Sequence, residues 1–445
     1  MTSMWFAQAL LPAGWAADVR VRLDGSLISA IEPGVPPEPG EDRYATALPG
    51  LPNLHSHAFQ RLMAGLAETR TGPDGDDFWS WRDLMYRIVG QISPGDMAAI
   101  AAMAFVEMLE AGFTRVGEFH YLHHQPDGRP YGNPAEMAAA LASAAAETGI
   151  ALTLLPVFYA HSGFGGAVPH AGQRRFICNV DQFATLREAC RQTLSAVPDA
   201  VLGLAPHSLR AVTPEELTAL LSLAGEGPVH IHIAEQTKEV DDCLDWSGQR
   251  PVAWLLNHYE VGPHWCLVHA THADAAELGR IAASGAVVGL CPVTEANLGD
   301  GIFPASAFAA AGGTFGIGSD SNVRIDAAGE LRLLEYGQRL SRRQRTVLAQ
   351  PDRSNGRLLF DTARAGGSTA LGGKPALQPG ARADIVALAA VPADTGDRAL
   401  DQWIFARGAV DAVWRAGRKV VSEGRHYRRA AIARRFADVA HKLIS

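Results

Sequence analysis

Eight short hydrophobic runs occur in the middle of the chain, each about as long as a β-strand. Stretches with apolar residues at helical spacing separate most of these runs, for example residues 94–112 and 134–149. Strands that alternate with helices are typical of α/β folds with a parallel sheet, and eight such units predict a (β/α)8 barrel of the TIM type. The eight runs are residues 49–55, 114–119, 150–158, 201–206, 228–234, 265–270, 286–291 and 314–319.

Both ends of the chain show a different pattern. Residues 18–34 alternate apolar and polar positions around Asp24-Gly25, which predicts a β-hairpin. Residues 380–390 and 408–426 also read as strands joined by turns. We therefore expect one small β-sandwich domain formed by residues 1–48 together with residues 376–445, which also include a terminal helix. The barrel would occupy residues 49–375.

Composition excludes several functional classes. The 445 residues are 47% hydrophobic and 19% charged, as in a globular protein with a large core. The net charge of −8 and the absence of a Lys/Arg-rich block argue against nucleic acid as a partner. No apolar run is long enough to cross a membrane, so no membrane partner is expected. The five cysteines show no CxxC spacing, which favours reduced thiols in a cytoplasmic protein.

Titratable side chains lie at the ends of most of the strand-like runs. Active sites of (β/α)8 barrels lie at the carboxyl ends of the strands. Six of the eight runs end with titratable side chains, which a random scatter of surface histidines would not produce. In chain order these residues are His55 and His57; His120 and Tyr121; His207 and Arg210; His230, His232 and Glu235; His269 and His272; and Asp320.

Three histidines and one aspartate form a candidate metal site. In a strand, residues i and i+2 point to the same side, so His55 and His57 can bind one cation together. An isolated His-x-His is also common in exposed loops, so further ligands are needed. His232 and Asp320 supply a third nitrogen and an oxygen. This set suits Zn²⁺, and Fe²⁺ or Mn²⁺ as alternatives.

Glu235 and His269 are the candidate catalytic side chains beside that site. Glu235 lies three residues beyond His232, where it can exchange protons with a water at the metal. His269 could either bind a second metal or hydrogen-bond the water. His230 is interpreted as a core histidine, and His272 as a cap for the helix that follows it.

The same residues carry a resemblance to the amidohydrolase superfamily. No lysine stands at the end of the fourth run, so the mononuclear deaminase branch fits better than the binuclear one. From about residue 49 to about residue 340 the motifs resemble the formimidoylglutamate deiminases. These motifs are NLHSHAFQRLMAGLAE, FWSWRDLMYR, EFHYLHHQPDGRPY, HSGFGG, PHSLRAVTP, VHIHIAEQTKEVDDC, WCLVHATHAD and TEANLGDGIFP.

The resemblance implies specific roles. One Zn²⁺ per chain would be held by His55, His57, His232 and Asp320, and Glu235, His269 and Asp320 would be catalytic. The reaction would convert N-formimino-L-glutamate to N-formyl-L-glutamate and ammonia, in histidine degradation. The dicarboxylate substrate would be held by Gln60, Arg82, Tyr121, His207 and Arg210. The superfamily also makes a homodimer plausible.

Two other functions remain open at this point. A related deaminase that acts on a heterocycle such as guanine would use the same metal ligands. Such an enzyme would have no use for Arg210, whereas a carboxylate can be gripped by two guanidinium nitrogens. A catalytically inactive binding protein is the second alternative, although such proteins usually lose metal ligands and this chain has all of them.

Overall fold

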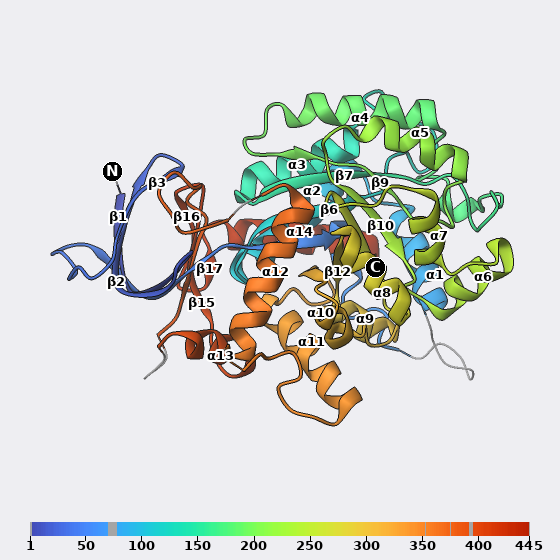
Figure 1. Cartoon of the computed structure of the whole chain (residues 1–445). Helices are drawn as coiled ribbons and strands as arrows, with labels where there is room; N and C mark the ends of the chain where they lie inside the picture. Colours follow the sequence, from blue (N-terminus) through green and yellow to red (C-terminus); the bar gives the residue numbers. More distant parts are fainter. Residues whose placement is uncertain (1, 70–77, 352, 374, 391–394, 445) are drawn as a thin grey trace.

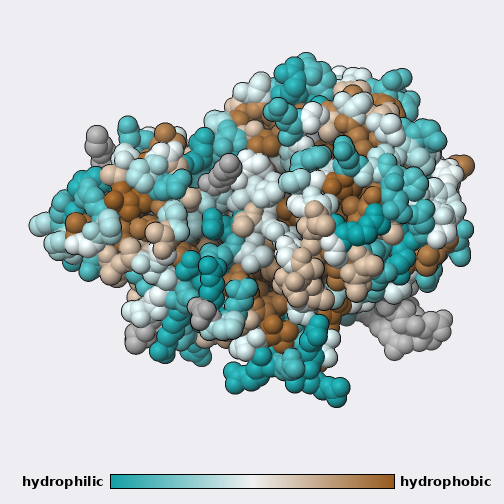
Figure 2. All heavy atoms as spheres, in the orientation of Figure 1, coloured by the Kyte–Doolittle hydropathy of each residue, from teal (hydrophilic) through white to brown (hydrophobic). Residues whose placement is uncertain are grey.

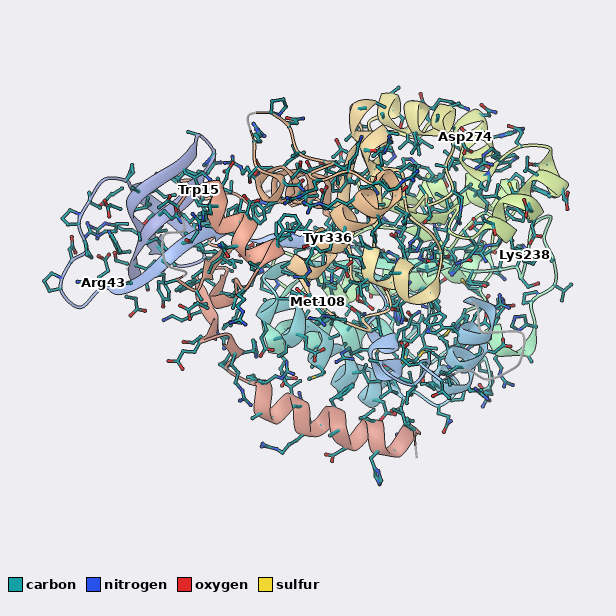
Figure 3. All side chains as sticks on the ribbon, turned by 90° about the horizontal axis from the view of Figure 1, so that it is seen from below. Trp15, Arg43, Met108, Lys238, Asp274 and Tyr336 are labelled. Atoms are coloured by element: carbon teal, nitrogen blue, oxygen red, sulfur yellow. The ribbon has the colours of Figure 1, made fainter. Side chains whose placement is uncertain are left out.

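The computed structural model describes residues 2–69, 78–351, 353–373, 375–390 and 395–444. Figure 1 shows two parts side by side: a sheet formed by both ends of the chain, and a larger body in which helices surround the remaining strands. In the view from below, Trp15 and Arg43 lie on the sheet of the chain ends, while Lys238 and Asp274 lie at the far end of the larger body (Figure 3).

Strands of the larger body coincide with the eight hydrophobic runs, and the fourth run contains two short strands. Most of their residues are buried, which explains why they read as continuous apolar segments. The strands are β5 (Leu51–Ser56), β6 (Phe113–His120), β7 (Ala151–Phe158), β8 (Val201–Leu202), β9 (Ala205–Pro206), β10 (Val229–Ile233), β11 (Trp265–His269), β12 (Val287–Leu290) and β13 (Thr314–Ile317).

These strands form two sheets in which every paired strand is parallel. One sheet has the order β5-β6-β7-β8, with β9 beside β7, and the other has the order β10-β11-β12-β13. Isolated parallel bridges link β5 and β10 to segments next to strands of the other sheet: Ser56 to Asp320, Leu204 to Val229, and Ser208 to His232. The predicted mixed α/β fold with parallel strands is therefore confirmed. Because the strands are parallel, their carboxyl ends meet at one edge.

Helices follow the strands of the larger body. The predicted helices of residues 94–112 and 134–149 are observed as α2 and α3, and Ser93 and Asp96 form a capping box at the start of α2. The helices are α1 (Phe78–Val89), α2 (Pro94–Glu110), α3 (Glu136–Thr148), α4 (Val180–Leu194), α5 (Pro214–Ala224), α6 (Thr237–Ser247), α7 (Pro251–His258), α8 (Ala275–Ser284), α9 (Pro292–Leu298), α10 (Ala305–Ala310), α11 (Ala327–Arg342) and α12 (Asn355–Leu371), with short 3-10 helices at Ala58–Met63 and Ala171–Gln173.

The chain ends share one eight-stranded sheet of order β17-β16-β15-β14-β4-β1-β2-β3. The predicted hairpin around Gly25 joins β2 and β3, and β14 pairs antiparallel with β4, which connects the two ends. A division of this sheet into two layers stays a prediction. Its strands are β1 (Thr2–Leu11), β2 (Gly14–Asp24), β3 (Leu27–Glu32), β4 (Asp42–Pro49), β14 (Ile385–Leu388), β15 (Val410–Arg415), β16 (Arg418–Ser422) and β17 (Arg425–His426), accompanied by α13 (Asp397–Phe405) and α14 (Arg429–Ile444).

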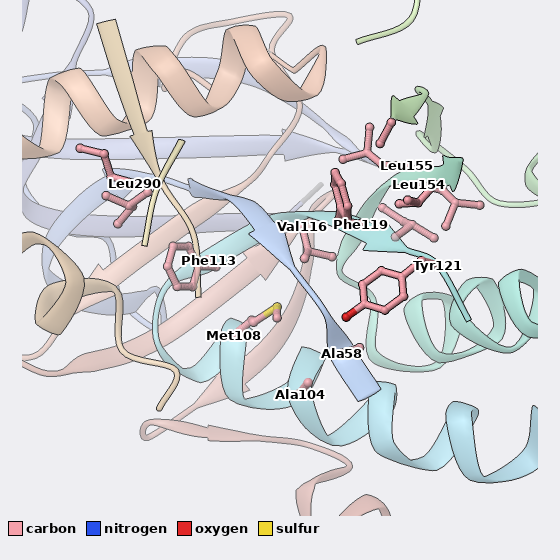
Figure 4. Close-up of a cluster of buried hydrophobic side chains, with 14 of the residues drawn as sticks. Ala58, Ala104, Met108, Phe113, Val116, Phe119, Tyr121, Leu154, Leu155 and Leu290 are labelled. Carbon is pink, nitrogen blue, oxygen red and sulfur yellow. The ribbon is translucent and has the colours of Figure 1, made fainter. Parts of the chain in front are cut away.

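The main hydrophobic core fills the space between the parallel strands and their helices. Figure 4 shows Met108 of α2 near Phe113 and Val116 of β6, with Tyr121 just beyond the end of that strand. On the outside, hydrophilic residues surround separate hydrophobic patches (Figure 2). Within the described residues, no helix combines the length and apolar character that a membrane span requires.

Candidate active site

Four buried side chains converge where β5, β10 and β13 end. His55 lies in β5 and His57 directly follows it, His232 lies in β10, and Asp320 lies three residues beyond β13. The His55 Nε2 atom lies 3.0 Å from His232 Nε2 and 3.2 Å from His57 Nε2. Asp320 Oδ1 lies 3.2 Å from His57 Nε2 and 3.5 Å from His55 Nε2. One ligand atom of each residue lies within 4.8 Å of all the others.

This donor set fits one metal ion. Zinc bonds to histidine nitrogen and carboxylate oxygen are about 2.0–2.2 Å long, so tetrahedral ligands lie roughly 3.4 Å apart. The His57 Nδ1 atom lies 2.8 Å from the carbonyl oxygen of Phe119, which can only accept, so this ring carries its proton on Nδ1 and presents a bare Nε2. Lone pairs that face one another in a buried site need a cation between them.

Electrostatics favours the ligand forms of these side chains. Burial lowers the pKa of His55 to about 3. Burial and the neighbouring imidazoles hold the pKa of His232 well below its usual range. For Asp320, burial raises the pKa, but the adjacent His55, His57 and His269 rings outweigh this effect and hold the pKa well below its usual value. Neutral imidazoles and an ionised carboxylate are the forms that bind a divalent cation.

A close contact between β5 and the end of β13 shapes this cluster. The His57 amide donates to the Asp320 carbonyl at 2.9 Å, and the Asp320 amide donates to the His55 carbonyl at 3.0 Å. At Gly318 a Cβ atom would lie 2.7 Å from the His55 carbonyl oxygen and 2.9 Å from its nitrogen. Only glycine allows the two backbones to approach this closely.

Glu235 and His269 lie beside the four-ligand cluster. Glu235 follows β10 by two residues, and its Oε1 lies 3.7 Å from Nε2 of His269, the last residue of β11. Glu295 Oε1 lies 3.2 Å from the other ring nitrogen of His269, and Asp320 Oδ2 lies 3.9 Å from Nε2. The His269 ring is therefore surrounded by carboxylates.

The pKa values of His269 and Glu235 are both raised, but for different reasons. Burial lowers the pKa of His269, but Glu235, Glu295 and Asp320 outweigh this effect and raise it to about 10. Burial raises the pKa of Glu235. A cationic imidazole beside a carboxyl group of raised pKa is suited to proton transfer at neutral pH.

An open cavity lies over this cluster. All the predicted substrate-binding residues line it, together with His57, His232, Glu235, His269 and Asp320. The structure thus brings the predicted site residues to one place, although they come from many separate segments. The other lining residues are Trp81, Met85, Tyr86, Tyr159, Phe176 and Leu298, and the predicted binding residues are Gln60, Arg82, Tyr121, His207 and Arg210.

Three uncharged side chains, Gln60, Tyr121 and His207, line the cavity near the metal ligands. The Gln60 amide donates to the Tyr121 hydroxyl at 3.0 Å, while Gln60 Oε1 has no hydrogen-bond partner among the described residues. His207 Nδ1 lies 3.1 Å from the Ser208 hydroxyl. Burial and the Arg210 charge hold the pKa of His207 well below its usual range, so this ring is neutral.

Arg210 supplies a largely buried positive charge to the cavity. Its side chain is 13% exposed, and Glu239 Oε2 lies 4.0 Å from one of its guanidinium nitrogens. That same oxygen accepts the Glu235 amide at 3.1 Å. Arg82, on α1, lies with its guanidinium carbon 5.5 Å from the ring centre of Tyr86. The cavity therefore contains two guanidinium groups.

Comparison with known proteins identifies the family. The model described as "Amidohydrolase family" matches residues 46–420, and the model "Formimidoylglutamate deiminase HutF, N-terminal domain" matches residues 1–45. The formimidoylglutamate deiminase of Pseudomonas aeruginosa is 50% identical over 455 residues, and the match covers all of both chains. The chain belongs to the formimidoylglutamate deiminase family of amidohydrolases.

Other amidohydrolases are similar to different degrees. A crystal structure described as an amidohydrolase from Brucella melitensis is 55% identical, covers 100% of both chains and superposes with a TM-score of 0.97. The 8-oxoguanine deaminase of Pseudomonas aeruginosa is 27% identical, over 81% of this chain and 79% of its own. An adenosine deaminase from Xanthomonas campestris with bound zinc has a TM-score of 0.81 at 22% identity, over 100% of this chain and 98% of its own, which shows a common fold.

Sequence reasoning missed several residues of this candidate site. Tyr159 directly follows β7, so the rule that picked residues at strand ends could have found it. Trp81, Met85 and Tyr86 come from α1, and no period-two or metal-ligand signal marks them. Asp300 offers a ligand atom within 4.8 Å of Glu235 and His269. Burial and the Glu235 charge raise the pKa of Asp300 to about 9.

Two histidines outside the cluster had been interpreted from the sequence. His230 is fully buried and its Nε2 lies 2.8 Å from the Ala370 carbonyl oxygen, as expected of a core histidine. The prediction that His272 caps the following helix is wrong. Asp274 is the N-cap of α8, and His272 instead donates to the Asp300 carbonyl at 2.8 Å. An aspartate accepts from the first amides of a helix more readily than an imidazole does.

Proposed function

We propose that this protein hydrolyses N-formimino-L-glutamate to N-formyl-L-glutamate and ammonia, with one zinc ion per chain, as a step of histidine degradation. The observation that carries the proposal is one cavity that joins a metal-ligand cluster, Glu235 and the largely buried Arg210. The metal cluster suits hydrolysis, and the guanidinium suits a substrate that carries carboxylates. The family of the chain, given above, supports the same reaction.

His55, His57, His232 and Asp320 would hold the zinc ion. Their donor set also accepts Fe²⁺ or Mn²⁺, and zinc is proposed because three nitrogens and one oxygen suit it well. When bound, such an ion lowers the pKa of water from 15.7 toward about 7 and so makes hydroxide available at neutral pH.

Glu235 is the proposed general base and acid. It takes one proton from the attacking water as the water oxygen bonds to the amidine carbon, and it delivers this proton to the terminal imino nitrogen. Protonated His269 donates a hydrogen bond to the attacking oxygen, and ionised Asp320 accepts one from it. The bond between carbon and the terminal nitrogen then breaks, the remaining hydroxyl proton leaves with ammonia, and the formyl C=O forms.

Positive groups in the cavity must attract the two carboxylates of the substrate to a protein of net charge −8. Arg210 is proposed to bind one carboxylate with two parallel hydrogen bonds, and Arg82 is the candidate for the other. Gln60, Tyr121 and His207 are proposed to hold the remaining polar atoms of the glutamyl part. The free Oε1 of Gln60 supports such a role, because a buried acceptor without a partner is costly.

We also infer the finer architecture. The three parallel bridges between the two groups of strands support closure into a (β/α)8 barrel, which would put all the strand ends around one mouth. We propose that residues 49–375 form this barrel, and that residues 1–48 and 376–445 form a β-sandwich domain with the terminal helix. A homodimer is proposed by analogy with the superfamily. The five cysteines are unpaired and buried, which supports a cytoplasmic location.

One assay tests the proposed reaction directly. Purified protein with one equivalent of zinc is incubated with N-formimino-L-glutamate, and ammonia, N-formyl-L-glutamate, glutamate and formamide are measured. We expect ammonia and N-formyl-L-glutamate in equal amounts. Glutamate with formamide would mean that the other C–N bond breaks, and turnover of guanine or 8-oxoguanine alone would favour a heterocycle deaminase. A protein that holds far less than one metal ion per chain, without chelator treatment, would favour a binding protein.

A further inference from the structure

Asn322 lies beneath the metal-ligand cluster and touches neither the cavity nor the proposed ion. Its side chain is fully buried, two residues after Asp320. The Asn322 Nδ2 group reaches three oxygen atoms: the Ser56 hydroxyl at 3.1 Å, the His57 carbonyl at 3.0 Å and the Asp320 carbonyl at 3.1 Å. An amide NH₂ group has two protons, so three acceptors use both of them and two of the oxygens share one proton.

The other end of the same amide is held equally firmly. Asn322 Oδ1 accepts a hydrogen bond of 2.6 Å from the Ser319 hydroxyl. The Ser319 hydroxyl accepts from Asn53 Nδ2 at 2.6 Å, and the Ser319 amide donates to Asn53 Oδ1 at 3.0 Å. A buried chain of hydrogen bonds thus runs from β5 through Ser319 to Asn322 and back to the residues that follow β5. Chains of this kind specify a unique geometry when every member is satisfied.

The backbone at this place is unusual and needs such support. Asp320 has φ +44° and Asn322 has φ +55°, both in the left-handed region. Non-glycine residues adopt this region rarely, and each instance costs on the order of 1–3 kcal/mol unless the surroundings hold it. Asparagine tolerates it better than most residues. The segment after β13 therefore does not adopt its shape by itself.

We propose that Asn322 is a positioning residue that sets the separation between His57 and Asp320 and thereby slows the loss of the metal ion. Its amide is the one group in this buried chain that binds the backbone of both ligands. The inference rests on the proposed function, because it presumes that the four-residue cluster holds a metal. Partners behind metal ligands commonly change metal retention or activity 10–100-fold when they are removed.

The decisive variant is Asn322→Asp, which keeps the shape of the side chain but replaces the NH₂ donor with an oxygen. Three oxygen acceptors would then face a carboxylate. We expect zinc to pass to a chelator about 10–100-fold faster than in the unaltered protein. Asn322→Ala, which removes the donor without adding charge, should show a smaller change in the same direction. With excess zinc, kcat should fall while KM stays near its original value.

Gln338→Ala is the matched control, because Gln338 of α11 is another buried amide, which donates to the Phe303 carbonyl at 2.8 Å and accepts from the Ser306 amide at 3.3 Å. The loss of these hydrogen bonds should lower thermal stability without changing the rate of zinc loss. Melting with and without zinc separates the two effects: a structural role lowers both temperatures equally, whereas a positioning role reduces the gain from zinc. If Asn322→Asp does not fold, Ser319→Ala tests the same chain with a smaller change.

The outcomes separate this inference from the proposed function. Zinc loss at the original rate in Asn322→Asp, or an equal acceleration in Gln338→Ala, overturns the positioning role while the reaction stands. If the unaltered protein binds no metal, the proposed function fails and the inference fails with it. Faster zinc loss in the Asn322 variants alone is the expected result.

Discussion

Replacing Arg210 with methionine removes a guanidinium and keeps an apolar stem of similar length. The change has two consequences in the structure. It removes the proposed partner of a substrate carboxylate, and it leaves Glu239, which is fully buried, without the cation 4.0 Å away. Because Glu239 Oε2 also accepts the Glu235 amide, the second consequence can reach the catalytic carboxylate.

The size of the loss in kcat/KM follows from the burial of the proposed pair between Arg210 and a substrate carboxylate. Truncating one partner of a buried, hydrogen-bonded charge pair costs about 2–5 kcal/mol. Each 1.36 kcal/mol is a factor of ten, so kcat/KM for N-formimino-L-glutamate should fall by about 30-fold to several thousandfold. A carboxylate remote from the reacting carbon is bound alike in the ground and transition states, so the loss should appear mainly in KM.

Substrate analogues identify the carboxylate that Arg210 binds. N-formiminoglycine lacks the side-chain carboxylate, and 4-(formiminoamino)butanoate lacks the α-carboxylate. The Arg210→Met variant should lose little activity toward the analogue whose missing carboxylate is the one that Arg210 binds. Arg82→Met is the matched control, and this variant should lose little activity toward the other analogue.

A double variant separates substrate binding from stability. Arg210→Met with Glu239→Gln removes the stranded negative charge, so thermal stability should recover while KM stays high. The reasoning is refuted if Arg210→Met keeps the original kcat/KM. It is equally refuted if the double variant recovers both stability and KM, because Arg210 would then serve only to compensate Glu239.

Three further predictions concern the metal, the general base and the small sheet. Dialysis against a strong chelator should abolish activity and lower the melting temperature, and one equivalent of zinc should restore both, since a ligand at 100 times its Kd adds about 2.7 kcal/mol. Glu235→Gln should lower kcat about 10²–10⁴-fold with little change in KM or zinc content, measured by steady-state kinetics and metal analysis; unchanged kcat would exclude Glu235 as the base. Burial raises the pKa of Glu41, but hydrogen bonds from Arg20 and Ser3 outweigh it and lower the pKa to about 2. Because the folded pKa is depressed, this stabilisation is present above pH 4.5 and is lost as pH falls toward 2. Glu41→Gln should therefore melt below the unaltered protein at pH 7, and this difference should disappear on acidification; a difference that persists at pH 2 would contradict the assignment.

Local patterns in the sequence were sufficient for the elements and for the kinds of chemistry. The eight hydrophobic runs predicted the strands because parallel strands covered by helices must be apolar on both faces. His55 and His57 pointed to one side because strand residues alternate, and His232 and Asp320 were found because they lie near or just beyond the ends of such runs. The resemblance to the deiminases added the substrate, which spacing alone did not indicate.

Contacts between distant segments could be found only in the folded protein. Asp300 contacts Gln236 and Asn322 contacts Ser56, partners that are distant in the sequence, and no local pattern around Asp300 or Asn322 predicts these contacts. The carboxylates around His269 likewise come from separate strands and helices. A pKa depends on the charges and the solvent around a group, so the sequence could not indicate that this imidazole is cationic while His55 is neutral.

The sequence by itself determined which residues become strands and helices, since periodicity, capping and turn residues act over a few positions. It also determined the ligand types for a divalent cation. Tertiary structure alone decided the distances between those ligands, the partner of Arg210 and the support that Asn322 gives. These depend on the register between strands that are far apart in the chain, and register is set by packing of the whole core rather than by any local pattern.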